Sequence, residues 1–145
     1  MISVYELAKS FILLDDKNID CEGITNLKLQ KLIYYAQGFH LALFDKPLFS
    51  EKIYAWKHGP VVPELYYKYK EYGKSSLPLP NDFDLEELDK EKFDLIEEVY
   101  SVFGQYTAWK LREMTHEEPP WKNHEPESGV IPESELKEYF KTRLN

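Results

Sequence analysis

The segment TNLKLQKLIYYAQGFHLALF, residues 25–44, decides the fold that this chain is expected to adopt. Thr25 suits the N-cap of a helix, because its hydroxyl can accept a hydrogen bond from a backbone N–H of the first turn. From Leu29 to Phe44, apolar residues recur at three- and four-residue spacing, and the aromatic residues among them leave little polar surface. A helix that is apolar on most sides is buried. We therefore expect a central helix here, with His40 as a hydrogen-bonded histidine of the core.

Other helices are predicted on both sides of this segment. Ser3 and Glu6 have the spacing of a capping box, so a helix should begin there. The segment LFSEKIYAWK, residues 48–57, is rich in aromatic and β-branched residues and predicts short strands. The expected fold class is mainly α, a compact single-domain bundle of about five to six helices with a small β-hairpin or short strand pair, over residues 1–145. Later helices should have Pro63 and Pro132 in their first turns, and others should be capped by Asp84 or Asp89 and by Thr107.

The stretch AWKHGPVVPELYYKYKEYG, residues 55–73, reads as a junction between a strand and a helix. Gly59 precedes Pro60 and is therefore pushed away from the helical region, so we expect the strand to end there. Pro63 suits the first helical position, where its missing N–H costs nothing. Gly73 is expected to close this helix in a left-handed conformation.

Composition and charge narrow the classes of partner. Apolar residues make up 43% of the 145 residues and aromatic residues 15%, including eleven tyrosines. The formal net charge of −8 is uneven: residues 1–80 carry +1 and residues 81–145 carry −9. An acidic field repels nucleic acid and attracts basic proteins. Tyrosine and tryptophan are enriched at protein interfaces, so the aromatic excess favours a protein-binding surface.

The cysteine content and the apolar runs of the sequence bear on the compartment in which the protein is expected. Cys21 is the single cysteine, which excludes an intrachain disulfide and a thiolate zinc cage within the monomer. The amino terminus lacks the basic and apolar pattern of a secretory leader, and no apolar run has the length of a membrane span. We expect a cytoplasmic protein with no membrane contact. The sequence leaves the oligomeric state open, a homodimer included.

The sequence offers weak signals for catalysis or nucleic-acid binding. It contains no phosphate-binding glycine motif, and His116 and His124 stand eight residues apart, which is not a metal-ligand spacing for one helix face. We therefore predict no catalytic residue, no metal site and no cofactor. Two alternatives stay open. One is a histidine-dependent hydrolase or metal enzyme that uses His58 and His116 in one pocket. The other is a nucleic-acid-binding regulator, which the acidity of the chain disfavours and whose phosphate contacts would be Lys28, Lys31, Lys68 and Lys70.

Four segments in a fixed order carry a family resemblance. They are TNLKLQKLIYYAQGFHLAL, PLFSEKIYAWKHGPVVPELYYKYKEYG, LREMTHEEPPW and IPESELKEYF. Together they resemble the SocA-like Panacea antitoxin domain, also described as phage-associated GepA-like. The signature positions are Leu29, Gln30, Lys31, Leu32, Tyr34, Tyr35, Ala36, Gln37, Ala55, Trp56, Gly59, Pro60, Val61, Pro63, Thr115, His116 and Trp121.

The resemblance implies a mostly helical antitoxin of a bacterial or phage toxin–antitoxin pair. Such a protein neutralises a cognate protein toxin by direct contact, and the toxin is encoded in the adjacent gene. The residues that we expect to contact the toxin are Lys31, Tyr35, Trp56 and His58, around an aromatic-lined surface. The other signature positions serve as scaffold or as contact.

Overall fold

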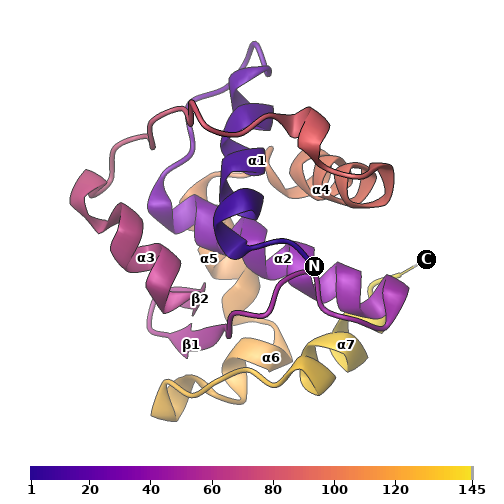
Figure 1. The fold of residues 1–145 in the computed structure, drawn as a ribbon. Helices are drawn as coiled ribbons and strands as arrows, with labels where there is room; N and C mark the ends of the chain where they lie inside the picture. The colour runs from indigo at the N-terminus through magenta and orange to yellow at the C-terminus, as the bar shows by residue number, and fades with distance from the viewer. Residues whose placement is uncertain (145) are drawn as a thin grey trace.

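A computed structural model describes residues 1–144 and confirms a mainly helical fold with one small sheet (Figure 1). The described residues form seven α-helices, where about five to six were expected. The additional helix is the single turn that begins at Pro119, where the sequence predicted only a break. The helices are α1 (Val4–Asp16), α2 (Asn26–Phe44), α3 (Pro63–Tyr69), α4 (Lys90–Phe103), α5 (Ala108–His116), α6 (Pro119–Lys122) and α7 (Glu133–Lys141).

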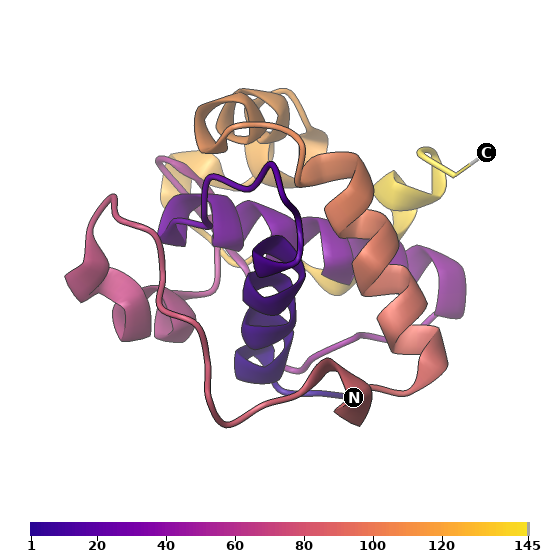
Figure 2. The same ribbon diagram turned by 90° about the horizontal axis from the view of Figure 1, so that it is seen from above.

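Helix α2 is the central helix that the opening segment predicts. The Thr25 side chain accepts a hydrogen bond from the Lys28 backbone N–H at 3.2 Å, which confirms the predicted N-cap. Figures 1 and 2 show α1 and α4 on one side of α2 and α6 and α7 on the other, while α5 packs along it. His40 is buried, and its Nδ1 donates to the Lys46 carbonyl oxygen at 2.6 Å. The prediction of a core histidine is therefore confirmed.

Helix starts follow the local chemistry of their caps. In α1, the Ser3 hydroxyl accepts from the Glu6 backbone N–H at 3.0 Å, and the Glu6 carboxylate accepts from the Ser3 backbone N–H at 3.1 Å. Asp89 and Thr107 cap α4 and α5 through their side chains, which accept from the backbone N–H groups of Lys92 and Lys110, without a reciprocal bond. Asp84, the alternative start of α4, instead caps a short 3₁₀ helix at Leu85–Glu87.

The Gly59–Pro60 step lies in a strand rather than ending one, which corrects the prediction. Strand β1 (Tyr54–Trp56) pairs in an antiparallel register with β2 (Gly59–Val61), so Ala55 faces Pro60. Only the last part of residues 48–57 forms a strand. The chain turns at residues 57–58, and Gly59 has a φ of +115°, which glycine adopts readily. Pro60 can stand in this strand because, among the described residues, β2 pairs with β1 on one side and is an edge of the sheet.

Helix α3 begins at Pro63, as predicted, but its end differs from the prediction. The helix stops at Tyr69 and continues as a 3₁₀ turn over Lys70–Tyr72. Gly73 follows that turn with a φ of +56° and a ψ of −123°, which is not the left-handed helical conformation. Its positive φ is the part of the prediction that holds.

One continuous cluster of buried apolar side chains runs from Val4 to Phe140. It draws on every helix, and α7 packs closely on α2 through Phe140, whose ring lies edge-on to the Tyr34 ring at 5.4 Å. Within residues 1–144, no helix combines the length and apolar character needed to cross a lipid bilayer.

Candidate protein-binding site

Two signature glutamines of α2 hold the chain segments that cross it. Gln30 accepts a hydrogen bond from the Val62 backbone N–H at 2.9 Å, at the start of α3. Gln37 accepts from the Leu48 backbone N–H at 2.7 Å and donates to the Phe49 carbonyl oxygen at 2.9 Å. Both glutamines are buried. They satisfy backbone groups that would otherwise be buried unpaired, so their role in this structure is scaffold.

The THEEPPW segment is joined to the hairpin through Trp121. The Trp121 indole N–H donates to the Trp56 carbonyl oxygen at 2.7 Å. The His116 imidazole stacks on the Trp121 indole, with ring centres 3.9 Å apart and planes 5° apart. Thr115 is buried, and its hydroxyl donates to the Arg112 carbonyl oxygen at 2.9 Å. These contacts bring the end of α5 against β1 and β2.

Lys31 lies beneath the hairpin instead of at its surface. Its side chain is 1% exposed, and Nζ donates to the Pro60 carbonyl oxygen at 3.2 Å. A Cβ at position 59 would lie 2.4 Å from Lys31 Cε. Two features therefore require glycine at position 59, namely the close approach of the Lys31 side chain to this backbone and the positive φ.

Four side chains around Lys31 form a group that we call the cationic cluster, namely Lys31, His58, Arg112 and His116. Burial, together with the positive charge of Arg112, lowers the pKa of Lys31 to about 7. Burial also lowers the pKa of His58 and of His116, and the charges of Arg112 and Lys31 act in the same direction on both. Gly59, next to His58, approaches both the Lys31 side chain and the Thr115 hydroxyl of α5, so the hairpin turn, α2 and α5 meet in one small region.

A second group surrounds Glu118, which is 5% exposed. Its two carboxylate oxygens accept hydrogen bonds from the Tyr34 and Tyr35 hydroxyls, each at 2.8 Å. Arg143 donates to the same carboxylate at 3.1 Å and to the Tyr139 hydroxyl at 2.8 Å. Burial raises the pKa of Glu118, and the hydrogen bonds from the two tyrosines and the charge of Arg143 oppose that rise. Glu118 therefore joins α2, α6 and the end of α7.

Sequence reasoning missed Glu118 and Arg143. The acidic residue before the Pro119–Pro120 pair in THEEPPW was a signal that could have drawn attention to position 118. No sequence signal points to Arg143, because it lies 25 residues from Glu118 along the chain.

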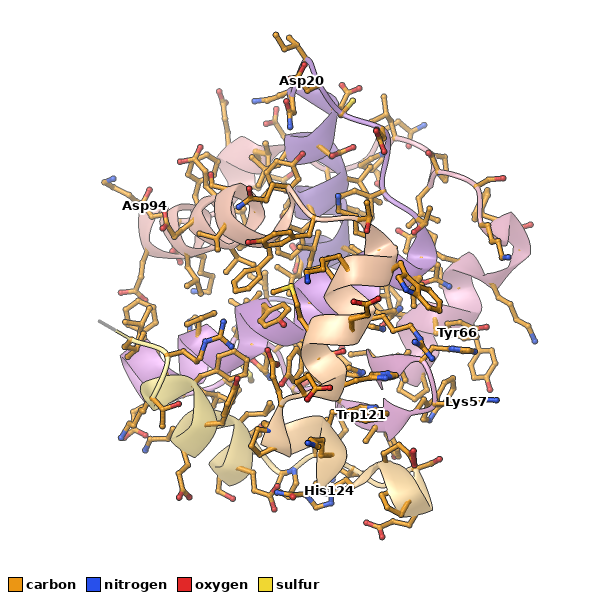
Figure 3. All side chains as sticks on the ribbon, turned by 180° about the vertical axis from the view of Figure 1, so that it is seen from behind. Asp20, Lys57, Tyr66, Asp94, Trp121 and His124 are labelled. Carbon is orange, nitrogen blue, oxygen red and sulfur yellow. The ribbon has the colours of Figure 1, made fainter. Side chains whose placement is uncertain are left out.

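An open pocket of about 670 Å³ lies between α5 and α7. In the view from behind, Figure 3 shows α5 at the centre, with Trp121 and His124 labelled below it and α7 to the lower left. Glu118 lines the pocket together with His116, Arg112, Tyr139 and Arg143. The pocket therefore borders the cationic cluster on one side and the Glu118 group on the other.

The four predicted toxin contacts occupy different depths. Lys31 and Tyr35 are buried, and Tyr35 stacks on Phe103 with ring centres 3.9 Å apart, so neither side chain lies on the surface. Trp56 is half-buried, and His58 is exposed at the turn of the hairpin. The structure brings Lys31 and His58 into one cluster and places Tyr35 in the other group.

Two aromatic rings of α3, half-buried Tyr66 and exposed Tyr67, lie beside Trp56. The Trp56 ring meets Tyr66 and Tyr67 edge-on, at centre distances of 5.5 and 6.1 Å. Tyr67 is 60% exposed, and so is Trp109 of α5, on which the Arg112 guanidinium stacks at 4.6 Å. We call Trp56, Tyr66, Tyr67 and Trp109 the aromatic face. Figure 3 shows Tyr66 and Lys57 on the side of the molecule next to α5.

The enzyme alternative named His58 and His116, and both belong to the cationic cluster. His124, the other histidine of the HEEPPWKNHE stretch, has its Nε2 2.8 Å from a Glu135 carboxylate oxygen. His116 stacks on Trp121. Over residues 1–144, no group of three or more His, Cys, Asp or Glu side chains is arranged to hold a metal ion.

Comparison with known proteins identifies the family of the chain. The family described as antitoxin SocA-like, Panacea domain, matches residues 29–122, a narrower range than the four segments quoted above. A stretch of 43 residues is 49% identical to Antitoxin SocA of Caulobacter vibrioides (strain NA1000 / CB15N). This stretch covers 30% of the chain and 23% of that relative. No solved structure matches the chain. Since the family match spans more than half of the chain and includes the α2, hairpin and THEEPPW segments, the protein belongs to the SocA-like Panacea domain family.

Proposed function

We propose that this protein is an antitoxin that binds a cognate protein toxin and neutralises it by direct contact, without catalysis. The observation that carries the proposal is the family match over residues 29–122, supported by the local identity to Antitoxin SocA. Residues 1–145 act as one Panacea unit in this proposal. The packing of α1 and α7 on α2 supports it, because both helices lie outside the matched range but share the same core.

The aromatic face is the proposed contact surface, together with His58. Tyrosine and tryptophan give large contact areas at a low entropic cost, since each side chain has only two rotatable bonds. Large apolar side chains that stay exposed in a folded monomer mark interaction sites when they gather in one place. Tyr67 and Trp109 have this exposure, and Trp56 lies beside Tyr67. The acidic half of the chain, residues 81–145, steers a basic toxin toward the protein.

Lys31 and Tyr35 take a supporting role in this proposal. Lys31 donates to the Pro60 carbonyl oxygen and so fixes the second strand of the hairpin. Tyr35 donates to Glu118 and stacks on Phe103. Both act from below the surface that Trp56 and His58 occupy.

Co-expression tests the proposal. The gene next to this one is expressed from an inducible promoter in a bacterial host, with and without this protein in the cytoplasm. We expect growth arrest with the neighbour alone, recovery with both proteins, and a stable complex on purification. A neighbour that is harmless by itself, or that stays toxic beside this protein, contradicts the proposal.

A further inference from the structure

We propose that the cationic cluster is a binding site for a carboxylate, presented by an aspartate or glutamate side chain of the protein partner. This inference rests on the proposed function, since it names the chemistry by which the partner is recognised. Arg112 and His58 are the accessible donors, and Lys31 adds positive charge from beneath them.

Three elements assemble the cluster at one place. Lys31 comes from α2, His58 from the turn between β1 and β2, and Arg112 and His116 from α5. The bond from Trp121 to the Trp56 carbonyl oxygen and the stacking of His116 on Trp121 fix the hairpin against α5. The cluster is thus held by buried contacts, which gives its donors defined positions before a ligand arrives.

The cluster lacks a carboxylate partner within residues 1–144. None of its four members takes part in an ion pair there, and Glu118 is engaged by Arg143 and two tyrosines. Arg112 Nε and His116 Nε2 are buried without a hydrogen-bond partner. Buried polar groups in native proteins are almost always paired, so unpaired donors beside a buried lysine point to an absent acceptor.

The charges around the cluster are mostly positive. Arg112 acts on Lys31, and Lys57 on the hairpin adds to the positive charge at His58. Glu117 is the nearby carboxylate, and it acts on His116 in the opposite direction to Arg112, Lys31 and His58. Within a chain of net charge −8, a local positive potential favours the binding of one negative group at this point.

A carboxylate on a protein fits the surroundings better than a phosphate of a nucleic acid. The acidic residues 81–145 repel a polyanion but tolerate a single negative group on a neutral or basic surface. The cluster borders the aromatic face, through the stacking of Arg112 on Trp109 and the sequence adjacency of Trp56 and His58. A planar guanidinium can donate two parallel hydrogen bonds to a carboxylate, and a position beside aromatic rings is typical of interface arginines.

The experiment measures the affinity of the full-length protein for its purified toxin by calorimetry. The variants are Arg112→Gln and Lys31→Met, and Lys122→Gln is the matched control, because Lys122 is an exposed cation outside the cluster. We expect about a tenfold or greater loss of affinity for the two cluster variants. The control should change affinity by less than about twofold. Unchanged affinity in both cluster variants, with neutralisation intact, overturns this inference and leaves the proposed function standing.

Two further measurements separate a recognition role from a structural one. Each aspartate and glutamate of the toxin is replaced, one at a time, by asparagine or glutamine. One of these replacements should weaken binding to the wild-type protein but have little further effect on binding to the Arg112→Gln variant. Binding should also take up protons near pH 7, measured in buffers of different ionisation enthalpy, and Lys31→Met should reduce this uptake. If no carboxylate couples to Arg112, and inorganic phosphate instead binds the free protein, the site is a small-anion site and the inference is wrong. If the wild-type protein forms no complex with the toxin, the proposed function fails and this inference fails with it.

Discussion

The indole N–H of Trp121 donates a hydrogen bond to the backbone carbonyl oxygen of Trp56 at 2.7 Å, and this bond joins α6 to the first strand of the hairpin. The two tryptophans lie 65 residues apart in the sequence. Through this contact, the HGPVVP turn and the THEEPPW segment form one structural unit around the end of α5. The position of the aromatic face relative to the cationic cluster depends on it.

Replacement of Trp121 by phenylalanine should destabilise the protein. The change removes the indole donor and leaves the partly buried Trp56 carbonyl oxygen without its partner, which costs about 1–3 kcal/mol. The free energy of unfolding in urea measures the loss. Trp109→Phe is the control, because Trp109 is 60% exposed and its change should stay within about 0.5 kcal/mol. Equal stability of the two variants would show that the Trp121 bond does not contribute.

Replacement of Gly59 by alanine should be more harmful than replacement of Gly73. The new Cβ would lie 2.4 Å from Lys31 Cε, and the φ of +115° is unfavourable for alanine, so we expect a loss of about 2 kcal/mol or more. Gly73 also has a positive φ, but its Cβ would meet no atom within 4 Å. Thermal unfolding of both variants compares the two sites. A Gly59 variant as stable as the Gly73 variant is inconsistent with the close approach of Lys31.

The stability of the protein should depend on pH through Lys31. The pKa of Lys31 is about 7 in the folded protein and 10.5 for a lysine in the unfolded chain. Between pH 7 and 10.5, the unfolded chain therefore binds one proton more than the folded protein. Stability from this group therefore rises with pH from about 7 to about 10, by up to about 1 kcal/mol per pH unit, and is lost as pH falls toward 7. Unfolding curves at several pH values should show this slope in the wild type.

The Lys31→Met variant is the companion to that measurement. It keeps the length of the side chain and removes the buried charge, so its stability at pH 7 should equal or exceed that of the wild type. The rise in stability between pH 7 and 10 should be smaller in the variant by the share that Lys31 contributes. A variant that keeps the full slope would assign the pH dependence to other groups.

Alanine at Tyr67 or Trp109 should weaken toxin binding with little effect on folding. Both side chains are 60% exposed, so their removal creates no cavity in the core. If they lie at the centre of the interface, each truncation should reduce affinity by about tenfold or more. Leu79→Ala is the matched control, since Leu79 is an exposed apolar residue on a separate loop. Growth rescue and calorimetry with the purified toxin provide the readouts, and unchanged affinity in both aromatic variants places the interface elsewhere.

Local chemistry was sufficient to predict where helices begin. The caps at Ser3, Thr25 and Thr107 depend on hydrogen bonds within one turn of the same residue, and all three are confirmed. The Gly59–Pro60 step was misread because its assignment depends on a partner strand, and the restriction on the residue before proline is compatible with a strand as well as with its end.

The candidate site depended more on tertiary contacts. Lys31 lies on the edge of the apolar stripe of α2, where sequence cannot distinguish a solvated lysine from one covered by a hairpin 29 residues away. Glu118 and Arg143 meet only because α6 and the end of α7 approach the same two tyrosines. The contact roles of Trp56 and His58 stay predictions, and the exposure of His58 is compatible with them.

The hydrogen bonds that hold the hairpin all end on its main chain. Lys31 binds the Pro60 carbonyl oxygen, Gln30 the Val62 N–H, and Trp121 the Trp56 carbonyl oxygen. Because these hydrogen bonds use only main-chain atoms of the hairpin, they do not depend on which side chains the hairpin presents to solvent. Those side chains can therefore be exchanged without refolding the protein, and, under the proposed function, a library randomised at positions 57 and 58 is a direct route to binding a different toxin.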